Sequence, residues 1–159
     1  MSNIVTFLTY KDRAEEAAKL YTSIFKDARI LSTLKYPDVS VSPSPGAVMV
    51  VEIELLGRRY VLLNGGDHFK FTDGISLSVE CDSQEEIDRY WDALVAGGGE
   101  HGPCGWLKDR FGVSWQVCPR DIAKYWGPSV PPDKAKRAME AMMKMSKLDI
   151  AALDRAVQA

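Results

Sequence analysis

The sequence predicts an α+β fold made of two βαβββ modules followed by a C-terminal helical extension. The first supporting observation is an internal repeat at a spacing of seventy residues, in which the strand-like TFLTY (6–10) aligns with SLSVE (76–80). The second is that the helix-like EEAAKLYTSIF (15–25) aligns without a gap with EEIDRYWDALV (85–95). The repeat occurs twice only, whereas a solenoid needs three or more units to bury a continuous core. Two copies of one unit therefore fit better than a repeat array.

The first module is expected at residues 1–66. Its alternating apolar residues at 3–9 indicate a buried strand, and an apolar stripe at helical spacing follows Asp12, which is the expected N-cap. The other predicted elements are a strand at 28–36, a proline- and serine-rich loop at 37–46, and a hairpin with strands at 47–55 and 58–66. The sequence leaves open whether the loop closes over a cavity.

The second module is expected at residues 74–120, with shorter strands. Ser83 is the expected N-cap of its helix, and the glycines at 97–99 end that helix because glycine accepts a left-handed backbone. The predicted elements are, in order, a strand at 75–82, a helix at 84–95, and short strands within 100–109 and 112–119. Asp109 and Arg110 are expected to build the last hairpin turn and a surface ion pair, which would contribute less than ~1 kcal/mol.

The C-terminal extension is expected at residues 121–159, and the whole chain is expected to pack as one compact domain. One helical turn at 121–126, a helix at 133–146 and a short helix at 150–157 are predicted. Methionines gather in the longer helix, at Met139, Met142, Met143 and Met145. Such a helix either presents an adaptable binding face or docks on its own domain or a dimer partner, and docking is the commoner role.

Composition excludes several classes of protein. The chain has 159 residues and a formal net charge of −2, and no stripe of lysine and arginine interleaved with aromatic residues indicates nucleic-acid binding. The N-terminus has no signal-peptide pattern, and no segment approaches the roughly 20 apolar residues that span a bilayer. The three cysteines are odd in number and lack CxxC spacing, which is typical of a reduced protein. A cytoplasmic protein without nucleic-acid or membrane partners is therefore expected.

Three segments carry a resemblance to a known family. LNGG (63–66), CGWLKD (104–109) and GVSWQV (112–117) resemble the vicinal oxygen chelate superfamily, which includes glyoxalase I, bleomycin resistance proteins and extradiol dioxygenases. They are most similar to its PhnB-like branch, labelled 3-demethylubiquinone 3-methyltransferase-like, and KMSKLDIAALDRA (144–156) is similar to the C-terminal segment of that branch. The resemblance covers nearly the whole chain. It implies curved sheets that enclose a cavity and, in most members, a homodimer.

The resemblance also locates the positions that hold a metal in the metal-using members, where histidine and glutamate come from the first and last strands of each module. The repeat places Thr6 and Ser76 at the first-strand positions, and Gln116 of GVSWQ stands where such members carry glutamate. In the last strand of module one, Leu62 or Asn64 would face inward, and Asn64 is favoured because it is polar. These four polar residues include no imidazole, thiolate or carboxylate, so neither a metal nor another cofactor is expected.

No other group supplies obvious ligands or a catalytic pair. The two histidines, His68 and His101, are predicted in loops of different modules and at no ligand spacing. Cys104 lies three residues from His101, and a histidine-activated thiolate would be a nucleophile. The favoured explanation is a structural thiol, because groups this close in a turn often point apart.

A cavity without metal ligands can still bind a small molecule. Aromatic walls with a few hydrogen-bonding groups are typical of such pockets. Trp106 and Trp115 could line the cavity or fill the core, whereas Phe25 and Trp91, on the two matched helices, are expected in the core. The candidate ligand-binding residues are therefore Thr6, Phe7, Asn64, Ser76, Cys104, Trp106, Trp115 and Gln116, with Phe111 as a further wall.

The function predicted from the sequence is metal-independent binding of a small molecule, with no reaction assigned. One alternative is a lyase or dioxygenase-type enzyme that uses a divalent metal. Another is a structural or regulatory homodimer whose cavity is filled by its own side chains. Methyl transfer is not expected, because the glycines at 97–99 follow a helix and the chain lacks the strand–helix alternation of nucleotide-binding folds.

Overall fold

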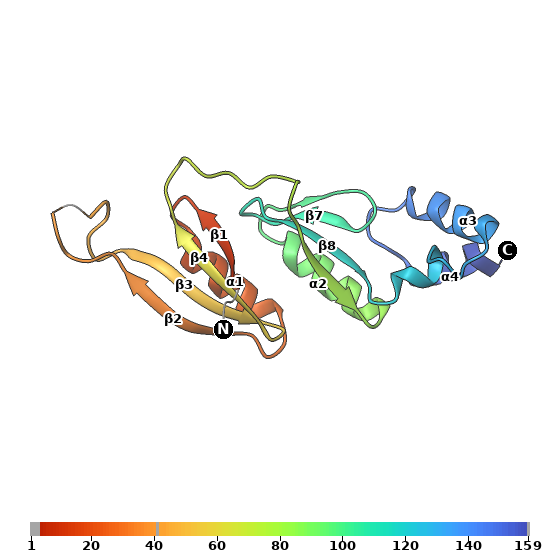
Figure 1. The fold of residues 1–159 in the computed structure, drawn as a ribbon, viewed down its shortest axis with the longest axis horizontal. Helices are drawn as coiled ribbons and strands as arrows, with labels where there is room; N and C mark the ends of the chain where they lie inside the picture. The colour runs from red at the N-terminus through yellow and green to blue at the C-terminus, as the bar shows by residue number, and fades with distance from the viewer. Residues whose placement is uncertain (1–3, 41, 159) are drawn as a thin grey trace. The chain divides into compact units, whose positions relative to one another are not determined.

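A computed structural model describes residues 4–40 and 42–158. The chain divides into two compact units, residues 1–71 and 72–159, and each is described by itself. Each unit contains a four-stranded sheet with a helix along one face, and the second unit also carries a helical extension (Figure 1). The predicted α+β fold with two βαβββ modules and a C-terminal helical extension is confirmed.

The first unit follows the predicted order of elements. These are β1 (Thr6–Tyr10), α1 (Ala14–Ile24), β2 (Arg29–Lys35), β3 (Val48–Leu55) and β4 (Arg58–Asn64). The strands lie in the order β1-β4-β3-β2, with β1 parallel to β4 and the other pairs antiparallel. The β3–β4 turn has positive φ at both Leu56 (48°) and Gly57 (77°), a geometry that matches the twist of a tight hairpin.

The second unit repeats this topology with shorter strands. Its elements are β5 (Leu77–Cys81), α2 (Gln84–Val95), β6 (Glu100–His101), β7 (Trp106–Lys108) and β8 (Ser114–Pro119), and the strands lie in the order β5-β8-β7-β6. The predicted N-cap of α2 is confirmed, because Ser83 Oγ accepts a hydrogen bond of 3.3 Å from the Glu86 N–H. His101 lies in β6, so its predicted position in a loop is wrong.

Each helix packs on one face of its own sheet. We call this face the helix face and the opposite face the open face. The helix face of the first sheet carries the fully buried Val51, Ile53 and Leu62, and α1 packs on β3 and β4. Within this core, the hydroxyl groups of Tyr10 and Tyr21 form a hydrogen bond of 3.1 Å. The core of each unit therefore lies between helix and sheet, and the open face is free for other roles.

The internal repeat changes register between strand and helix. In the helices the seventy-residue spacing holds, since the buried Tyr21 matches the buried Trp91. In the strands the matching buried residues are Leu8 and Val79, and their spacing is one residue longer than the seventy residues of the helices. Three residues separate β1 from α1, but two separate β5 from α2. Because a shift of one residue reverses strand faces, Thr6 is not equivalent to Ser76 as the sequence repeat predicted.

The C-terminal extension forms a small helical cluster of its own. It consists of the 3₁₀ turn η1 (Ile122–Tyr125) and helices α3 (Pro132–Met142) and α4 (Ile150–Gln158), which lie side by side (Figure 1). Buried Tyr125, Ala138 and Leu153 form its centre, with Met142 and Met145 packed against them. None of the helices in the described ranges is long and apolar enough to cross a membrane.

The helix α3 ends at Met142, four residues before the predicted end at Ser146. The residues that follow leave the helix because their backbone bonds to the second sheet. The Met145 carbonyl accepts from the Cys104 N–H at 2.8 Å, and the Ser146 carbonyl accepts from the Gly105 N–H at 2.7 Å. The extension is thus tied to its own unit at the turn before β7.

Candidate functional site

Gln116 and Ser76 meet on the open face of the second sheet. Gln116 Nε2 donates a hydrogen bond of 2.8 Å to Ser76 Oγ. The neighbouring residue Trp106 pairs directly with Gln116 across β7 and β8, which places it on the same face. Three of the candidate residues therefore lie together on one surface of the second unit.

Trp115 lies on the opposite, helix face of the same sheet. Its side chain is 2% exposed, and its indole Nε1 donates a hydrogen bond of 2.8 Å to Asp109 Oδ2. The expectation that Trp115 lines a ligand cavity is therefore wrong, and its role is in the core. The cause is the two-residue period of a strand, since Trp115 neighbours Gln116 in sequence and must face the other way.

Asp109 lies in the predicted turn but is buried, so its predicted place on the surface is wrong. Only 3% exposed, it accepts hydrogen bonds at Oδ1 from the N–H groups of Phe111 (2.9 Å) and Val113 (3.1 Å). Its second oxygen accepts from Trp115. The carboxylate thus closes the β7–β8 turn and anchors a core indole. Phe111 takes part through its backbone in this turn.

The candidate residues of the first unit do not form a cluster. Asn64 Oδ1 accepts from the Ala14 N–H at 2.8 Å, and its Nδ2 donates to the Val48 carbonyl at 2.9 Å, so it faces the helix. The expected N-cap Asp12 is wrong, because the N-cap position is Arg13, which makes no side-chain cap. Thr6 shares its strand face with the helix-facing Leu8, whereas Phe7 lies on the open face and is 59% exposed.

Cys104 faces the C-terminal extension. Its sulfur lies 3.6 Å from the Met142 carbonyl oxygen and 3.8 Å from Met143 Sδ. The His101 ring instead stacks on Trp91, with centroids 5.1 Å apart and planes at 6°. The two side chains have different neighbours, so they do not form the cysteine–histidine pair considered from the sequence. Cys104 has φ of +57° and lies in the turn to which the extension is tied.

A cavity of about 410 Å³ opens on the second unit beside Trp106. Trp106 is half-buried and forms the aromatic part of the wall. The polar part consists of Asp73, Glu100, His101, Lys108 and Ser114. The sequence singled out His101 only beside Cys104, and it predicted none of the other four. Lys108 could have been found, because it lies two residues from Trp106 on one strand, whereas Asp73 precedes β5 and no pattern connects it to the sheet.

An ion pair spans one side of this cavity. Lys108 Nζ lies 3.0 Å from Asp73 Oδ1, and the buried Ser114 donates a hydrogen bond of 2.9 Å from Oγ to the same oxygen. These two hydrogen bonds, with that from Lys108 the stronger cause, hold the pKa of Asp73 below its ordinary value. The Asp73 carboxylate therefore has two partners and is negatively charged at neutral pH.

A second cavity of about 340 Å³ lies in the first unit, near the start of α1. Pro43 and Ser44 of the proline- and serine-rich loop line it together with Lys11 and Tyr36. The Tyr36 hydroxyl donates a hydrogen bond of 2.7 Å to the Asn64 carbonyl. The loop therefore lies over a hollow of its own unit.

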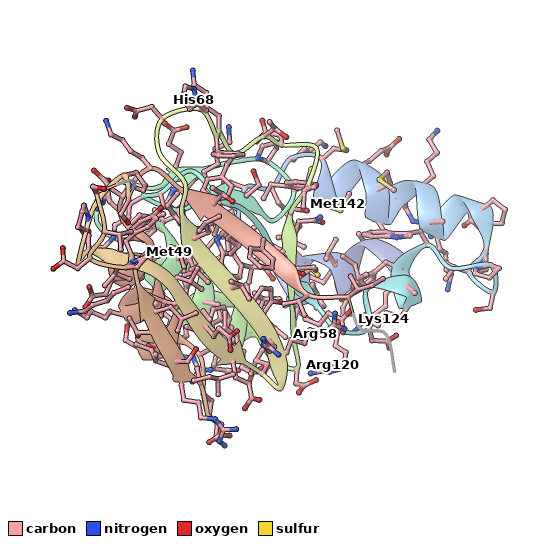
Figure 2. The ribbon with its side chains drawn as sticks, turned by 60° about the vertical axis from the view of Figure 1, so that its left-hand side comes forward. Met49, Arg58, His68, Arg120, Lys124 and Met142 are labelled. Atoms are coloured by element: carbon pink, nitrogen blue, oxygen red, sulfur yellow. The ribbon has the colours of Figure 1, made fainter. Side chains whose placement is uncertain are left out.

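The donor groups present do not fit the divalent metal of the metal-using superfamily members. On the open face of the second sheet, the polar groups near Gln116 are the hydroxyls of Ser76 and Ser78 and the thiol of Cys118, which lies 3.4 Å from Ser78 Oγ. In residues 4–40 and 42–158, no three histidine, cysteine, aspartate or glutamate side chains converge. His68 lies in an exposed loop and points away from its sheet (Figure 2).

Comparison with known proteins places these features in a family. The 3-demethylubiquinone-9 3-methyltransferase family matches residues 2–118. A PhnB protein from Bacillus cereus is 33% identical with a TM-score of 0.63, and the match covers 73% of this chain and 98% of that one. None of the curated proteins matches the chain.

Two less similar structures share the fold. A Pseudomonas aeruginosa protein is 23% identical, with a TM-score of 0.57 and coverage of 75% of this chain and 98% of that one. The fosfomycin resistance protein FosX from Mesorhizobium loti is 13% identical, with a TM-score of 0.53 and coverage of 73% and 89%. The matched family and the similar structure from Bacillus cereus together lead to one conclusion: the chain belongs to the 3-demethylubiquinone-9 3-methyltransferase family.

Proposed function

We propose that the chain binds a small organic molecule on the open face of its second sheet, in the cavity beside Trp106, and that binding needs no metal ion. The observation that carries this proposal is the cavity itself, which combines a half-buried indole with a few polar side chains. Its volume of about 410 Å³ lies in the range of small-molecule sites. The single indole offers a flat apolar surface, and the polar groups gather at one end.

The absence of a metal requirement follows from the chemistry of the donors. By the sequence resemblance, Gln116 stands at the position where metal-using members carry glutamate; its amide donates to Ser76. A neutral amide and hydroxyl offset the dehydration of a divalent ion poorly. The divalent-metal enzyme considered from the sequence would need at least three converging anionic or imidazole donors. Neither described sheet supplies such a set on its open face.

Methyl transfer, which the family description names, receives no support from the fold. Each sheet contains one parallel strand pair, β1 with β4 and β5 with β8, and all its other pairs are antiparallel. Nucleotide-like cofactors usually bind where a glycine-rich turn joins a strand to a helix in a parallel sheet. Here the glycines at 97–99 follow α2 and lead into β6. Ligand binding is therefore the better-supported function.

A thermal-shift screen of small aromatic fragments, in the presence of a metal chelator, tests the proposal. At least one fragment is expected to raise the melting temperature of the wild type. Trp106→Leu is expected to abolish this shift, whereas Trp126→Leu, which removes a half-buried indole from the helical extension, should retain it. Stabilisation that appears only with a divalent ion, or that survives in Trp106→Leu, would contradict the proposal.

The homodimer expected from the family resemblance also remains a proposal, and the sheet edges support it. β1 and β5 are the terminal strands of their sheets, and each pairs on one side only within its sheet. Apolar side chains lie exposed there, Phe7 of β1 at 59% and Ile75, two residues before β5, at 77%. Exposed apolar edges of this kind are usually covered by another chain or segment. Light scattering during size-exclusion chromatography tests this, and a mass of 17.7 kDa at micromolar concentration would contradict it.

A further inference from the structure

We propose that the cavity beside Trp106 selects molecules that carry a positively charged amine next to a flat apolar group. The inference rests on the proposed function, because it names the ligand class for the same cavity. Two carboxylates and one ammonium group line the cavity, in Asp73, Glu100 and Lys108, together with the imidazole of His101. With that imidazole neutral, the excess of one negative charge favours a cationic ligand over an anionic one.

The arrangement of these charges leaves acceptors available for a ligand. Lys108 and Ser114 both bond to Oδ1 of Asp73. Its second oxygen, Oδ2, has no hydrogen-bond partner among the described residues. An ammonium group could therefore bond to Asp73 without displacing Lys108. Ser114 is 2% exposed and holds the carboxylate in place before the ligand arrives.

Glu100 supplies the second acceptor. It lies directly opposite Lys108 in the β6–β7 ladder, which puts the two side chains on the same face of the sheet. Lys108 makes its ion pair with Asp73, and Glu100 takes part in no ion pair within residues 4–40 and 42–158. Asp73 and Glu100 thus lie on either side of Lys108, each with oxygen atoms available to an amine.

Trp106 provides the surface for the flat apolar part of the ligand. Its half-buried indole lies two residues from Lys108 on β7 and therefore on the same open face. An indole attracts both flat apolar rings and cations, because the face of its π-system is negative. A molecule with an aromatic ring and an adjacent ammonium group matches both features at once. An anion would meet Glu100 and the Asp73 carboxylate and would have to compete for the single ammonium group of Lys108.

Three probes of similar shape and different charge test this inference: benzylammonium, benzyl alcohol and benzoate. Their affinities are measured by ligand-observed NMR titration at pH 8, where an ordinary imidazole is neutral. Benzylammonium is expected to bind about tenfold more tightly than benzoate, the effect of two solvent-exposed ion-pair contacts. Glu100→Gln is expected to reduce this preference, and Lys108→Gln, which removes the competing cation, is expected to increase it.

Glu140→Gln is the matched control, because it makes the same charge change on α3 at a residue that does not line the cavity. It should leave the preference unchanged. Tighter binding of benzoate that is lost in Lys108→Gln would overturn the inference and still leave small-molecule binding at Trp106 intact. Equal binding of all three probes, or no binding of benzylammonium, would also overturn it. The separate fragment screen with Trp106→Leu decides the proposed function independently of charge.

Discussion

Asn64 joins three segments of the first unit through a single side-chain amide. Its oxygen accepts from the first N–H of α1, and its nitrogen donates to the Val48 carbonyl at the start of β3. Helix N-termini leave their first N–H groups without partners inside the helix, and a polar side chain from elsewhere in the fold can satisfy one of them. Asn64 thus replaces the local N-cap that the sequence suggested at Asp12.

Asn64→Ala is expected to lower the free energy of unfolding by about 2 kcal/mol, because it leaves one donor and one acceptor unpaired in a part-buried site. Asn64→Asp is the comparison, since it keeps the acceptor for Ala14 but turns a carboxylate oxygen towards the Val48 carbonyl in place of the donor, at a cost of at least ~1 kcal/mol. Urea denaturation measures both. An alanine variant as stable as the wild type would show that neither hydrogen bond matters to stability.

Asp109 supports the turn between β7 and β8 and the core at the same time. In Asp109→Asn the side-chain oxygen can still accept from the two backbone N–H groups, but the NH₂ group then faces the Trp115 indole N–H, donor against donor. We therefore expect the free energy of unfolding to fall by about 2 kcal/mol, because the buried indole N–H loses its acceptor. Asp109→Ala should cost more. Thermal unfolding followed by tryptophan fluorescence checks the order, and equal stability of the two variants would contradict it.

Cys81 makes the stability of the second unit sensitive to alkaline pH. Burial, and to a lesser extent the nearby charge of Glu86, raises the pKa of its thiol from 9.0 to about 12. The unfolded chain therefore loses this proton near pH 9, while the folded protein keeps it until about pH 12. The contribution to stability is fully present below pH 9 and is lost as the pH rises from 9 towards 12.

The stability advantage of the wild type over Cys81→Ala is accordingly expected to shrink between pH 9 and pH 11. Urea unfolding of the two proteins at a series of pH values measures this difference, and comparing the pair removes the contribution of other titrating groups. A wild-type advantage that stays constant up to pH 11 would contradict the assignment.

At the scale of elements, the segment between α3 and α4 fastens the extension to the second sheet. Besides the two backbone bonds at the turn before β7, Ser146 Oγ donates to the Gly102 carbonyl at 2.7 Å. Leu148 is 1% exposed and lies against Gly105, where an added Cβ would meet its side chain at 3.1 Å. Gly105 also has φ of +84°, so the motif CGW provides the close approach that this segment needs.

Leu148→Ala is expected to destabilise the protein by about 3 kcal/mol through the cavity it leaves. Hydrogen exchange should show faster exchange at the N–H groups of Cys104 and Gly105, which bond to this segment. Ser146→Ala, which removes one hydrogen bond, should cost about 1 kcal/mol. If Leu148→Ala left the exchange of those two N–H groups unchanged, the extension would not be held at this turn.

The elements themselves were largely predictable, and the faces of the strands were not. The helix predicted at 84–95 has those bounds in the structure, because helical periodicity and the Ser83 cap agree. The error at Thr6 arose because one residue more separates β1 from α1 than separates β5 from α2. The error at Asn64 arose because its partners are 50 and 16 residues away in sequence. Neither the extra residue before α1 nor the distant partners of Asn64 can be recognised from a local sequence pattern.

At the scale of the whole molecule, the two units share a topology and differ on their open faces. The first open face carries cross-strand ion pairs, between Arg59 and Glu52 at 2.7 Å and between Arg29 and Glu54 at 3.0 Å. The second carries the Trp106 cavity and the Ser76–Gln116 hydrogen bond. The fold and the family could be predicted from the motifs. The two carboxylates of the cavity wall could not, since Asp73 and Glu100 reach it from segments outside those motifs, whereas Lys108 and Ser114 lie within them.

The central claim is that a small molecule binds beside Trp106 without a metal. The most direct measurement is NMR of protein labelled with ¹⁵N at its four tryptophans, titrated in the presence of chelator with a fragment that stabilises it. The indole resonance of Trp106, assigned by its loss in Trp106→Leu, is predicted to move, while that of Trp115, bonded to Asp109, should stay in place. A saturating titration that leaves the Trp106 resonance unmoved, or a movement that requires an added divalent ion, would contradict the account.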